Sequence, residues 1–493
     1  MLYTPPDPSK GLWDTWVFQH GDLYHLFHLQ RDHDEVGCSS IGHAVTRDWR
    51  HWKTLPPVLA QDAGDTWDNG PLMTGMVVEH AGRFFMFYGA MVDRVQRIGL
   101  AVSDDLIHWE KLGQNPVLEP GGPWYETDPR RASNYETAWR DPYVFYHAPD
   151  ACYYAFLCAR VANASETGGG CIAIASSRDL LDWTLLPPAY VSDTLTCLEV
   201  PEYFALNGRH YITYTTSYHF GTPYPVDDPY QATGTFYLES GEMLAGYAAP
   251  DHPNTLVASL PNSGANYVGR SIPHPTAPAR RLYYYQNVPP VRLGESEHGS
   301  LAAPKQLEAL PDGRLNLTYA ADILDPLFED TPLPVPALQP DRPIALTGAS
   351  LDAGEIAATV RVPYAGICLH VGPQREGMPE GLAVWTAPNR AGSADRWVML
   401  GTVHLADGPS GVRPVLGRPA ALRKLTTPSD DRGARLRVMW RGPFVDVYVE
   451  DTLYLSHAFA PEELPSSRQA GVFRAGTPAA TDVTEVVVRR MQM

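Results

Sequence analysis

The feature that most constrains this chain is a repeated pattern, in which an apolar strand is followed by a fixed turn and a tryptophan. Three copies occupy residues 41–52, 98–109 and 172–183. In each copy an Ile precedes an Asp by seven residues, and a Trp follows that Asp by four. Each copy therefore predicts a strand, a turn opened by Ser or Thr and Asp, and a Trp that anchors the next strand.

A second repeated element is a turn followed by an aromatic strand. Its five copies, spaced roughly 60 residues apart, are Gly21–Phe27, Gly82–Tyr88, Cys152–Phe156, Gly208–Tyr214 and Arg280–Tyr285. Units of this size, built from short strands, are typical of radially arranged sheets. The strand-like alternation excludes a helical solenoid, which would need a period near 3.6. We predict an all-β protein in which residues 1–330 form a five-bladed β-propeller that carries the catalytic site.

The composition agrees with an all-β chain and narrows its partners. The chain holds 41 Gly and 46 Pro, which indicates many turns between short elements. With 44% hydrophobic and 19% charged residues, a mostly disordered chain is excluded. The formal net charge is −18 and no basic run is present, so a nucleic acid would be repelled. We expect a small-molecule or oligosaccharide substrate, because neutral sugars fit this charge.

Three further features bear on location. No apolar run approaches the roughly 20 residues that span a bilayer, so we expect no membrane partner. The first seven residues show neither the basic nor the apolar region of a secretory signal. The cysteines are scattered without a CxxC pair, as expected of free, mostly buried thiols in a reducing compartment: Cys38, Cys152, Cys158, Cys171, Cys197 and Cys368. We predict a cytoplasmic protein, and its oligomeric state stays open.

The character of the chain changes after Leu327. Residues 331–343 are rich in Pro, which donates no backbone hydrogen bond, so they predict a stiff linker. Alternating strands follow at the spacing of a β-sandwich, at residues 356–362, 435–440, 444–449 and 483–488. We predict a β-sandwich domain over residues 344–493.

Three acidic residues stand at equivalent places in the propeller repeat. Asp14, Asp141 and Glu199 each begin the strand that precedes an aromatic strand, and that preceding strand is the inner one of its blade. Because equivalent positions in different blades point to the same end of the central channel, we expect these carboxylates to converge. Such a cluster either binds a cation or supplies an acid and a nucleophile for glycosidic bond cleavage. The acids of the loop at residues 62–68 are expected to be solvated, although Asp68 can reach the rim of the channel.

The segments that carry these acids resemble the signature motifs of glycoside hydrolase family 32, the β-fructofuranosidases (invertases, inulinases and levanases). The likeness extends over nearly the whole chain. The matching segments are Leu12–Asp14 with Tyr24–Phe27, Ile41–Asp48, Ser103–Trp109, Trp139–Phe145 with its Arg-Asp-Pro, Leu198–Phe204, Ala303–Leu307, and Arg435–Phe459 in the family's C-terminal sandwich.

The resemblance implies roles for individual residues. Asp14 would be the nucleophile that forms a covalent glycosyl-enzyme, and Glu199 the acid/base that protonates the leaving oxygen and then activates water. Asp141 would hold sugar hydroxyls, with Arg140 orienting the site. Glu199 should be protonated at the start while Asp14 stays ionised. The resemblance implies no cofactor and no metal.

The chain departs from the family pattern around these acids. The nucleophile stands in Trp13-Asp14-Thr15-Trp16 where the family has Asn-Asp-Pro-Asn, and Val200 replaces the Cys that usually follows the acid/base. Thr74 lies in the segment that corresponds to the family's Phe-Ser-Gly, and Gln30 is one position off the family's Gln. We expect sugar contacts from Trp13, Trp16, Gln30, Asp68, Thr74 and Arg140, although a Trp beside a repeat strand also fits a core role.

Four functions stay open at this point. The first is a retaining furanosidase, with β-fructofuranosides as the leading substrate and arabinofuranosides as an alternative. The second is an enzyme that transfers the glycosyl unit to another sugar, since the acceptor site is built by loops. The third is an inverting glycosidase or a phosphorylase on the same scaffold. The fourth is a sugar-binding protein without activity, which the retention of all three acids argues against.

Overall fold

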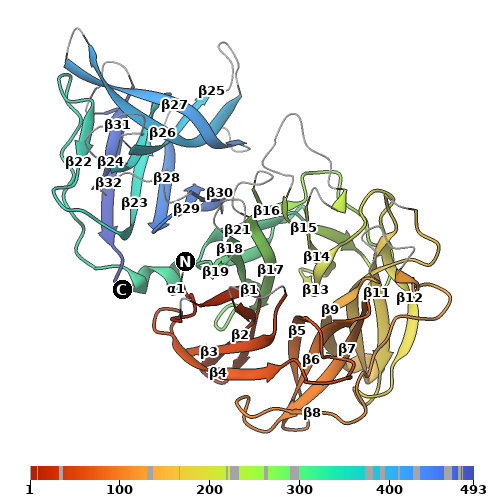
Figure 1. Cartoon of the computed structure of the whole chain (residues 1–493). Coiled ribbons are helices and arrows are strands. Elements are labelled where there is room, and N and C mark those ends of the chain that lie inside the picture. The colour runs from red at the N-terminus through yellow and green to blue at the C-terminus, as the bar shows by residue number, and fades with distance from the viewer. Residues whose placement is uncertain are drawn as a thin grey trace.

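The computed structural model consists almost wholly of β-strands (Figure 1). It describes residues 2–7, 9–32, 37–129, 137–165, 167–217, 220–221, 233–259, 265–288, 299–371, 381–388, 395–408, 411–425, 433–459, 469–475, 479 and 481–492.

Four antiparallel sheets of four strands each form separate blades. The first holds β1 (Lys10–His20), β2 (Leu23–Asp32), β3 (Ser40–Thr46) and β4 (Lys53–Ala60). The second holds β5 (Leu72–His80), β6 (Arg83–Val92), β7 (Val95–Ser103) and β8 (Glu110–Lys111). The third holds β9 (Trp139–His147), β10 (Cys152–Arg160), β11 (Gly170–Ser177) and β12 (Thr184–Val191), with a 3₁₀ turn at Ala148–Asp150. The fourth holds β13 (Glu199–Leu206), β14 (Arg209–Thr216), β15 (Thr233–Ser240) and β16 (Thr255–Ser259).

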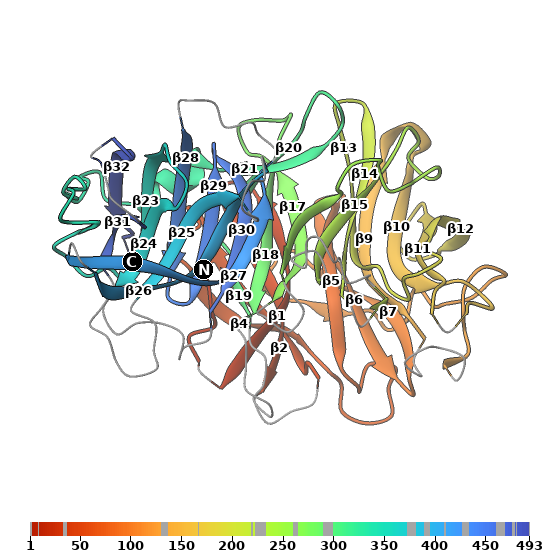
Figure 2. The same cartoon turned by 90° about the horizontal axis from the view of Figure 1, so that it is seen from above.

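A further set of strands closes the ring between the fourth and the first blade. It comprises β17 (Ala265–Pro273), β18 (Arg281–Val288), β19 (Ser300–Leu301), β20 (Lys305–Ala309) and β21 (Leu315–Tyr319). Strand β17 contacts both β13 and β1, and β1, β5, β9, β13 and β17 contact one another in sequence around the channel (Figure 2). The N-terminus adds to the closure, since Leu301 forms a bridge with Tyr3 and accepts a 2.7 Å bond from the Leu2 amide.

The prediction of an all-β, propeller-like fold is confirmed, but the prediction of five separate blades is wrong. The structure has four separate blades, and β17–β21 belong instead to a ten-stranded sheet that runs on into the C-terminal strands. The connection is made where β21 pairs with β30 at Thr318 and Thr452. A sheet edge that pairs with another strand is no longer an edge, so this set of strands does not end as an isolated blade.

The C-terminal strands form two sheets that share a hydrophobic core. The continuation of the ten-stranded sheet holds β30 (Thr452–Ala458), β29 (Phe444–Val449), β28 (Ala434–Arg441), β23 (Ala353–Val360) and β32 (Val483–Arg490). The second sheet holds β22 (Ile344–Leu346), β31 (Gln469–Arg474), β24 (Ala365–Val371), β25 (Gly381–Pro388), β26 (Arg396–Gly408) and β27 (Gly411–Lys424). One buried cluster contains Ile356 and Val438 of the first sheet and Ile367 and Val472 of the second.

A short helical segment, α1 (Ala321–Leu324) with a 3₁₀ turn at Asp325–Leu327, precedes the Pro-rich segment. Within that segment the Leu333 amide donates a 2.8 Å bond to the Val488 carbonyl, so it is tied to the last strand. The division of the chain at residues 330 and 344 stays a prediction.

The repeated turn has the same hydrogen bonds in all three copies. One oxygen of Asp48, Asp105 or Asp179 accepts the amides two and three residues later, at 2.8–2.9 Å. The indole of Trp52, Trp109 or Trp183 then donates to the carbonyl three residues before it, at 3.0–3.1 Å. The spacing of Asp and Trp in the sequence is thus the spacing of one hydrogen-bonded turn, as predicted.

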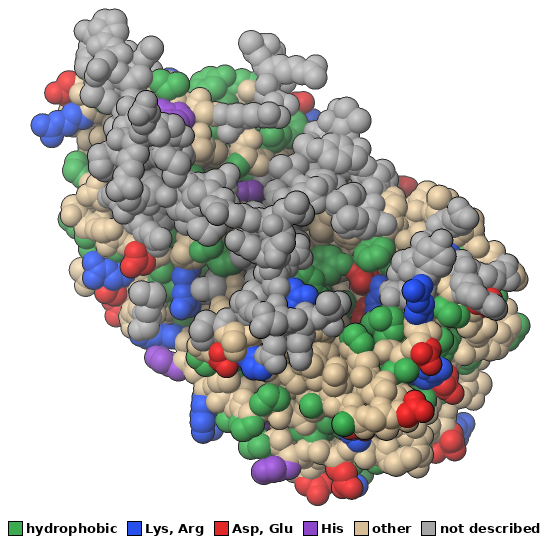
Figure 3. Space-filling model, viewed as in Figure 1, with side chains coloured by type: hydrophobic (Ala, Val, Ile, Leu, Met, Phe, Trp, Pro, Cys, Tyr) green, Lys and Arg blue, Asp and Glu red, His purple; other side chains and the backbone are tan. Residues whose placement is uncertain are grey.

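All six cysteines are free, and all but Cys152 are buried. No helix among the described residues is long and apolar enough to cross a bilayer. On the described part of the face shown in Figure 3, basic side chains are interspersed with acidic and neutral ones. The cytoplasmic location stays a prediction.

One buried ion pair ties the ring-closing strands to the C-terminal sheet. The Lys305 ammonium, which has no exposed surface, donates to the Asp446 carboxylate at 2.6 Å and to the Ala303 carbonyl at 2.7 Å. It also lies 4.7 Å from the centre of the Tyr285 ring. Burial removes both charges from water, so each depends on the other.

We predict that Lys305→Met destabilises the protein by about 3–5 kcal/mol, because it leaves the Asp446 charge buried without its partner. Thermal unfolding followed by circular dichroism measures the loss. The double variant Lys305→Met/Asp446→Leu should recover much of it, and Lys424→Met, which breaks an exposed pair with Asp395, should change little. Equal melting temperatures for Lys305→Met and Lys424→Met would contradict the prediction.

Candidate active site

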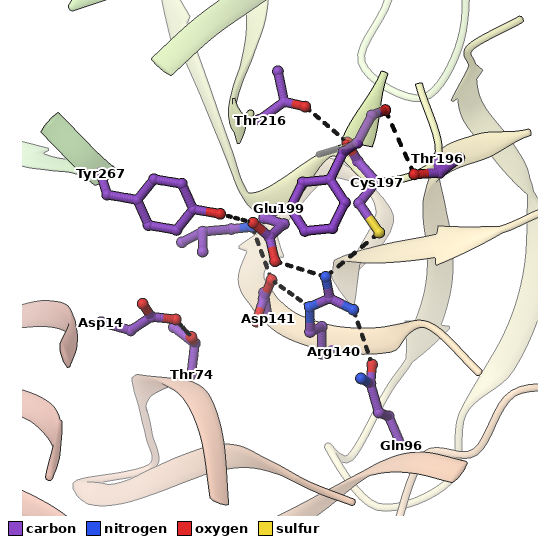
Figure 4. Close-up of polar contacts among 12 residues, drawn as sticks. Asp14, Thr74, Gln96, Arg140, Asp141, Thr196, Cys197, Glu199, Thr216 and Tyr267 are labelled. Atoms are coloured by element: carbon purple, nitrogen blue, oxygen red, sulfur yellow. Dashed lines mark hydrogen bonds and ion pairs between the residues drawn. The ribbon is translucent and has the colours of Figure 1, made fainter. Parts of the chain in front are cut away.

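Three inner strands bring Asp14, Asp141 and Glu199 together at one level of the channel (Figure 4). Asp14 lies in β1, Asp141 in β9 and Glu199 at the start of β13. Asp14 and Asp141 are 9% and 2% exposed, and the negative charges of Asp141 and Glu199 both act on Asp14. The predicted convergence of the three carboxylates is therefore what the structure shows.

Each inner strand loses register with its neighbour at this level. The irregularities fall at Asp14 in β1, at Thr74 in β5, and at Val200–Pro201 and Val268–Gly269 in β13 and β17. In β9 the irregularity falls at Asp141–Pro142. A bulge turns side chains out of strand alternation, so it re-aims them towards the axis.

Backbone strain gathers at the same level. Asp141, Val200 and Val268 have φ values of 58°, 48° and 53°. The left-handed region is tolerated by Asp but costly for a β-branched residue, and such strain is common at functional sites. Position 75, at the same level, requires a glycine for a steric reason, because a Cβ there would lie 2.6 Å from the Phe87 carbonyl oxygen.

Arg140 links two of the three carboxylates. Its Nη2 donates to Glu199 Oε1 at 2.7 Å, and its Nε lies 3.5 Å from Asp141 Oδ2. Gln96 Oε1 accepts a 3.2 Å bond from Nη1, and the Cys197 thiol lies 3.5 Å from Nη2. Asp141 Oδ2 also accepts a hydrogen bond from the Val200 amide at 2.9 Å. With Arg140 7% exposed, its guanidinium is held in one orientation.

Asp14 is held by one hydrogen bond and leaves one oxygen free. The Thr74 hydroxyl donates to Oδ2, whereas Oδ1 is buried and has no partner among the described residues. Burial, followed by the charges of Asp141 and Glu199, raises the pKa of Asp14 to about 7, although Thr74 and Arg270 act in the opposite direction. Protonation of Asp14 is therefore easier than that of a solvated carboxylate, and its ionised state at the start of the reaction stays a prediction.

Glu199 has a partner on each oxygen. Arg140 occupies Oε1, and the Tyr267 hydroxyl donates to Oε2. Burial and the Glu199 charge raise the pKa of Tyr267, so this phenol stays protonated as a donor. The side chain of Glu199 is 14% exposed, which leaves it accessible from the channel.

The other residues expected to contact sugar lie in different surroundings. Trp13 is half-buried, with its ring centre 6.2 Å from that of Tyr267, so it stands beside the carboxylates. Trp16 is 2% exposed and stacks on Phe27 in the core between blades, so it does not reach the carboxylate cluster. Trp139, the residue before Arg140, has no exposed surface and is a core residue as well.

Among the contacts described, neither Gln30 nor Asp68 touches the carboxylates, and both serve local structure. Gln30 pairs with Leu12 across the β1–β2 hairpin and donates weakly to Ser40 Oγ at 3.4 Å. The expectation that Asp68 is solvated is wrong, because Asp68 is fully buried and accepts bonds from Lys111 at 2.7 Å and Tyr88 at 2.9 Å. Sugar contacts from these two residues stay predictions.

Sequence reasoning missed Tyr267, Gln96 and Cys197. Tyr267 is the last paired residue before the bulge of β17, as Glu199 is in β13 and Arg140 in β9, and that equivalence is the signal that would find it. The Cys that follows the acid/base in the family is absent at position 200. Cys197, two residues before Glu199, places its thiol against Arg140 instead. Nothing in the local sequence marks Gln96, which reaches the site from β7.

The structure also bears on a cation among these acids. Within the described ranges, no group of three or more His, Cys, Asp or Glu is arranged to hold a metal ion. The Arg140 guanidinium already lies against both Asp141 and Glu199. A positive charge is thus supplied by the chain itself at the place where the carboxylates meet.

Comparison with known sequences finds a likeness over the first half of the chain. The model described as "Glycosyl hydrolases family 32 N-terminal domain" matches residues 14–243. The sucrose-6-phosphate hydrolase of Zymomonas mobilis is 27% identical over 216 residues, which is 40% of this chain and 39% of that protein. The fructan 1-exohydrolase of Aegilops tauschii is 28% identical over 194 residues, 37% of this chain and 30% of that protein. The matched region thus spans about two fifths or less of these relatives' length.

Solved structures share the fold over nearly the whole chain. The sucrose-6-phosphate hydrolase of Lactobacillus gasseri superposes with a TM-score of 0.72 at 18% identity, covering 98% of this chain and 91% of that one. The fructan 1-exohydrolase IIa of Cichorium intybus gives 0.71 at 14% identity, covering 99% and 96%. These likenesses show the fold, and the region that matches the family 32 N-terminal domain contains Asp14, Asp141 and Glu199.

We predict that Thr74→Val raises the pKa of Asp14 by about one unit, because a hydrogen bond to the ionised carboxylate is lost. Carbon-13 NMR titration of Asp carboxyls, with the Asp14 signal assigned by its absence in Asp14→Asn, measures the shift. Thr74→Ser keeps the hydroxyl and should titrate like the wild type. An unchanged midpoint in Thr74→Val would show that this bond does not govern Asp14.

Proposed function

We propose that the protein is a glycoside hydrolase that releases a terminal β-fructofuranosyl unit by a retaining double displacement, with Asp14 as nucleophile and Glu199 as acid/base. The observation that carries the proposal is that two carboxylates from different blades meet in one channel in different hydrogen-bonding environments. Two such groups are what this reaction requires. The match of residues 14–243 to the N-terminal domain of glycoside hydrolase family 32 supports the same conclusion.

The contacts of Asp14 suit a nucleophile. Thr74 orients the carboxylate through Oδ2, and the unpaired Oδ1 is the oxygen that would attack the anomeric carbon. Once Oδ1 forms the covalent bond, the negative charge on Asp14 is lost. Because Asp141 and Glu199 repel that charge, its loss also relieves the repulsion among the three carboxylates.

The contacts of Glu199 suit a group that changes its protonation state within one cycle. The Tyr267 hydroxyl can donate to an ionised carboxylate and accept from a protonated one, so it can serve both states. Glu199 would protonate the leaving oxygen in the first step and take a proton from water in the second. Arg140 holds the other oxygen throughout and limits rotation of the carboxyl group.

Asp141, Arg140 and Trp13 would shape the sugar site. Asp141 uses Oδ2 for Val200 and Arg140, which leaves Oδ1 for a sugar hydroxyl. The half-buried Trp13 ring, beside Tyr267, offers an apolar face to a furanose ring. The relatives named for sucrose-6-phosphate and fructan hydrolysis support a fructoside as substrate. We also propose that residues 1–330 are the catalytic unit and that the enzyme is cytoplasmic.

We expect the purified protein to release fructose from at least one of sucrose, sucrose 6-phosphate, inulin and levan. Asp14→Asn and Glu199→Gln should each lose at least about a thousandfold in kcat/KM, because each removes one of the two groups that form the transition state. Asp104→Asn, the same change at an exposed carboxylate, is the control and should keep full activity.

Product analysis by chromatography separates the remaining functions. Longer fructosyl oligosaccharides in place of free fructose would indicate a transferase. Release of a pentose from synthetic arabinofuranosides would mean that the substrate is an arabinofuranoside and not a fructoside. Retention is tested by carbon-13 NMR of the anomeric C2 of the fructose first released. Activity that survives both Asp14→Asn and Glu199→Gln would overturn the proposed roles.

The raised pKa of Asp14 predicts the pH dependence of the reaction. The nucleophile must be ionised, and its pKa of about 7 means that kcat/KM falls as the pH drops through 7. Well below that value the fall approaches tenfold per pH unit. A kcat/KM profile measured between pH 4 and 8 checks this, and an acid limb near pH 4 would contradict it.

A further inference from the structure

A cavity lies on the channel axis beyond the carboxylates. It has a volume of about 270 Å³ and is lined by residues that follow the site residues along the same inner strands, among them Trp16, Met76, Tyr143, Arg270 and Ser271. Gln19 and Pro273, which also line it, are half-buried and exposed, so the cavity opens towards solvent at the end away from Asp14.

Arg270 stands between this cavity and the carboxylates. The residue is 3% exposed, and its guanidinium reaches from β17 across the channel to two other blades. Nη1 donates to the Gly75 carbonyl at 3.0 Å, and Nη2 lies 3.5 Å from the Pro142 carbonyl. Its Nε is buried and has no partner among the described residues.

The two carbonyls that Arg270 contacts belong to the bulges of β5 and β9. Gly75 directly follows Thr74, and Pro142 directly follows Asp141. In both strands the register shifts at this place, so Arg270 bonds backbone at the points where the ladders are irregular. A guanidinium presents several donors in a fixed plane, so one side chain can fix both segments at once.

The charge of Arg270 acts on the carboxylates from the side of the cavity. It acts on Asp14 and Asp141, and it also acts on Glu202, Tyr143 and Tyr284 on the cavity side. The ionisable groups around Asp14 are Asp141 from β9, Glu199 from β13, and Tyr267 and Arg270 from β17, with Cys38 nearby. Arg140 is paired with Glu199 and Asp141, and among the described residues Arg270 is a cation that lowers the pKa of Asp14.

We propose that Arg270 is a positioning residue for the catalytic carboxylates: it cross-links the bulges that carry Thr74 and Asp141 and places a positive charge beneath Asp14. The inference rests on the proposed function in that Asp14 is taken as the nucleophile. The hydrogen bonds described for Arg270 go to backbone carbonyls, and it acts through Thr74, Asp141 and Asp14.

The test compares Arg270→Ala and Arg270→Lys with the wild type and with Arg160→Lys, a buried arginine paired with Glu126. The first readout is the carbon-13 titration of the Asp14 carboxyl, which needs no turnover. We expect the midpoint to rise by about one unit in Arg270→Ala, because an opposite charge is lost. Arg270→Lys keeps the charge and should shift less, and Arg160→Lys should not shift at all.

The second readout is the pH profile of kcat/KM, whose acid limb should move upward with the titration midpoint. The third is chemical rescue. Truncation of Arg270 to Ala extends the cavity to the carboxylates, so millimolar guanidinium chloride should restore activity to this variant more than equal sodium chloride does. The wild type and Arg270→Lys should show no such gain.

The outcomes separate this inference from the proposed function. If the wild type turns over no fructoside but the Asp14 midpoint rises in Arg270→Ala, the proposed function fails and the positioning role stands. If the protein is active and the midpoint, the acid limb and the response to guanidinium are all unchanged in folded Arg270→Ala, the inference is overturned. Should Arg270→Ala not fold, an Arg270→Lys profile equal to that of Arg160→Lys overturns it.

Discussion

A break in strand register at one level of the ring governs where the polar side chains of this channel lie. In a regular strand, alternate side chains point to opposite faces, so an inner strand would present an axial residue only at every second position. The bulges at Asp14, Thr74 and Asp141 and their counterparts in β13 and β17 relax that rule at the same height in every strand. The carboxylates, Thr74 and Tyr267 then meet, although they come from strands far apart in the sequence.

This arrangement concentrates negative charge where water is scarce, and the structure offsets it from two sides. Arg140 lies between Asp141 and Glu199, and Arg270 lies beneath Asp14. Burial still dominates at Asp14, whose pKa is raised to about 7. A carboxylate in such a setting is a strong nucleophile when ionised, since it is poorly solvated, and the cost is that a larger fraction is protonated near neutral pH.

Much of the propeller-like fold and of the carboxylate site could be predicted from the sequence, because the repeat is regular. The Asp and Trp spacing of the turns, the aromatic second strands and the acids at strand starts all follow from one repeated unit. Tyr267 fell outside the prediction because the equivalent position in β17 holds a phenol, and only acids were sought there. Arg270 and Gln96 could not be found, because their importance comes from reaching across to other blades. The raised pKa of Asp14 could not be predicted, since sequence spacing carries no measure of burial.

The number of separate blades was predicted wrongly for the same reason, because it depends on contacts between strands far apart in the sequence. The repeat correctly marks the aromatic strand β18, but no local signal shows that β21 pairs with β30 and so joins the C-terminal sheet. That junction matters for the site, because β17 supplies both Tyr267 and Arg270. Asn266, next to Tyr267, donates to the Ser456 carbonyl at 2.7 Å, and Tyr285 of β18 bonds the Ser456 hydroxyl at 2.8 Å. The C-terminal sheet therefore fixes β17, the strand that completes the channel. Among the contacts described, none of its residues touches the three carboxylates, so it contributes to the site by holding the backbone of β17 in place.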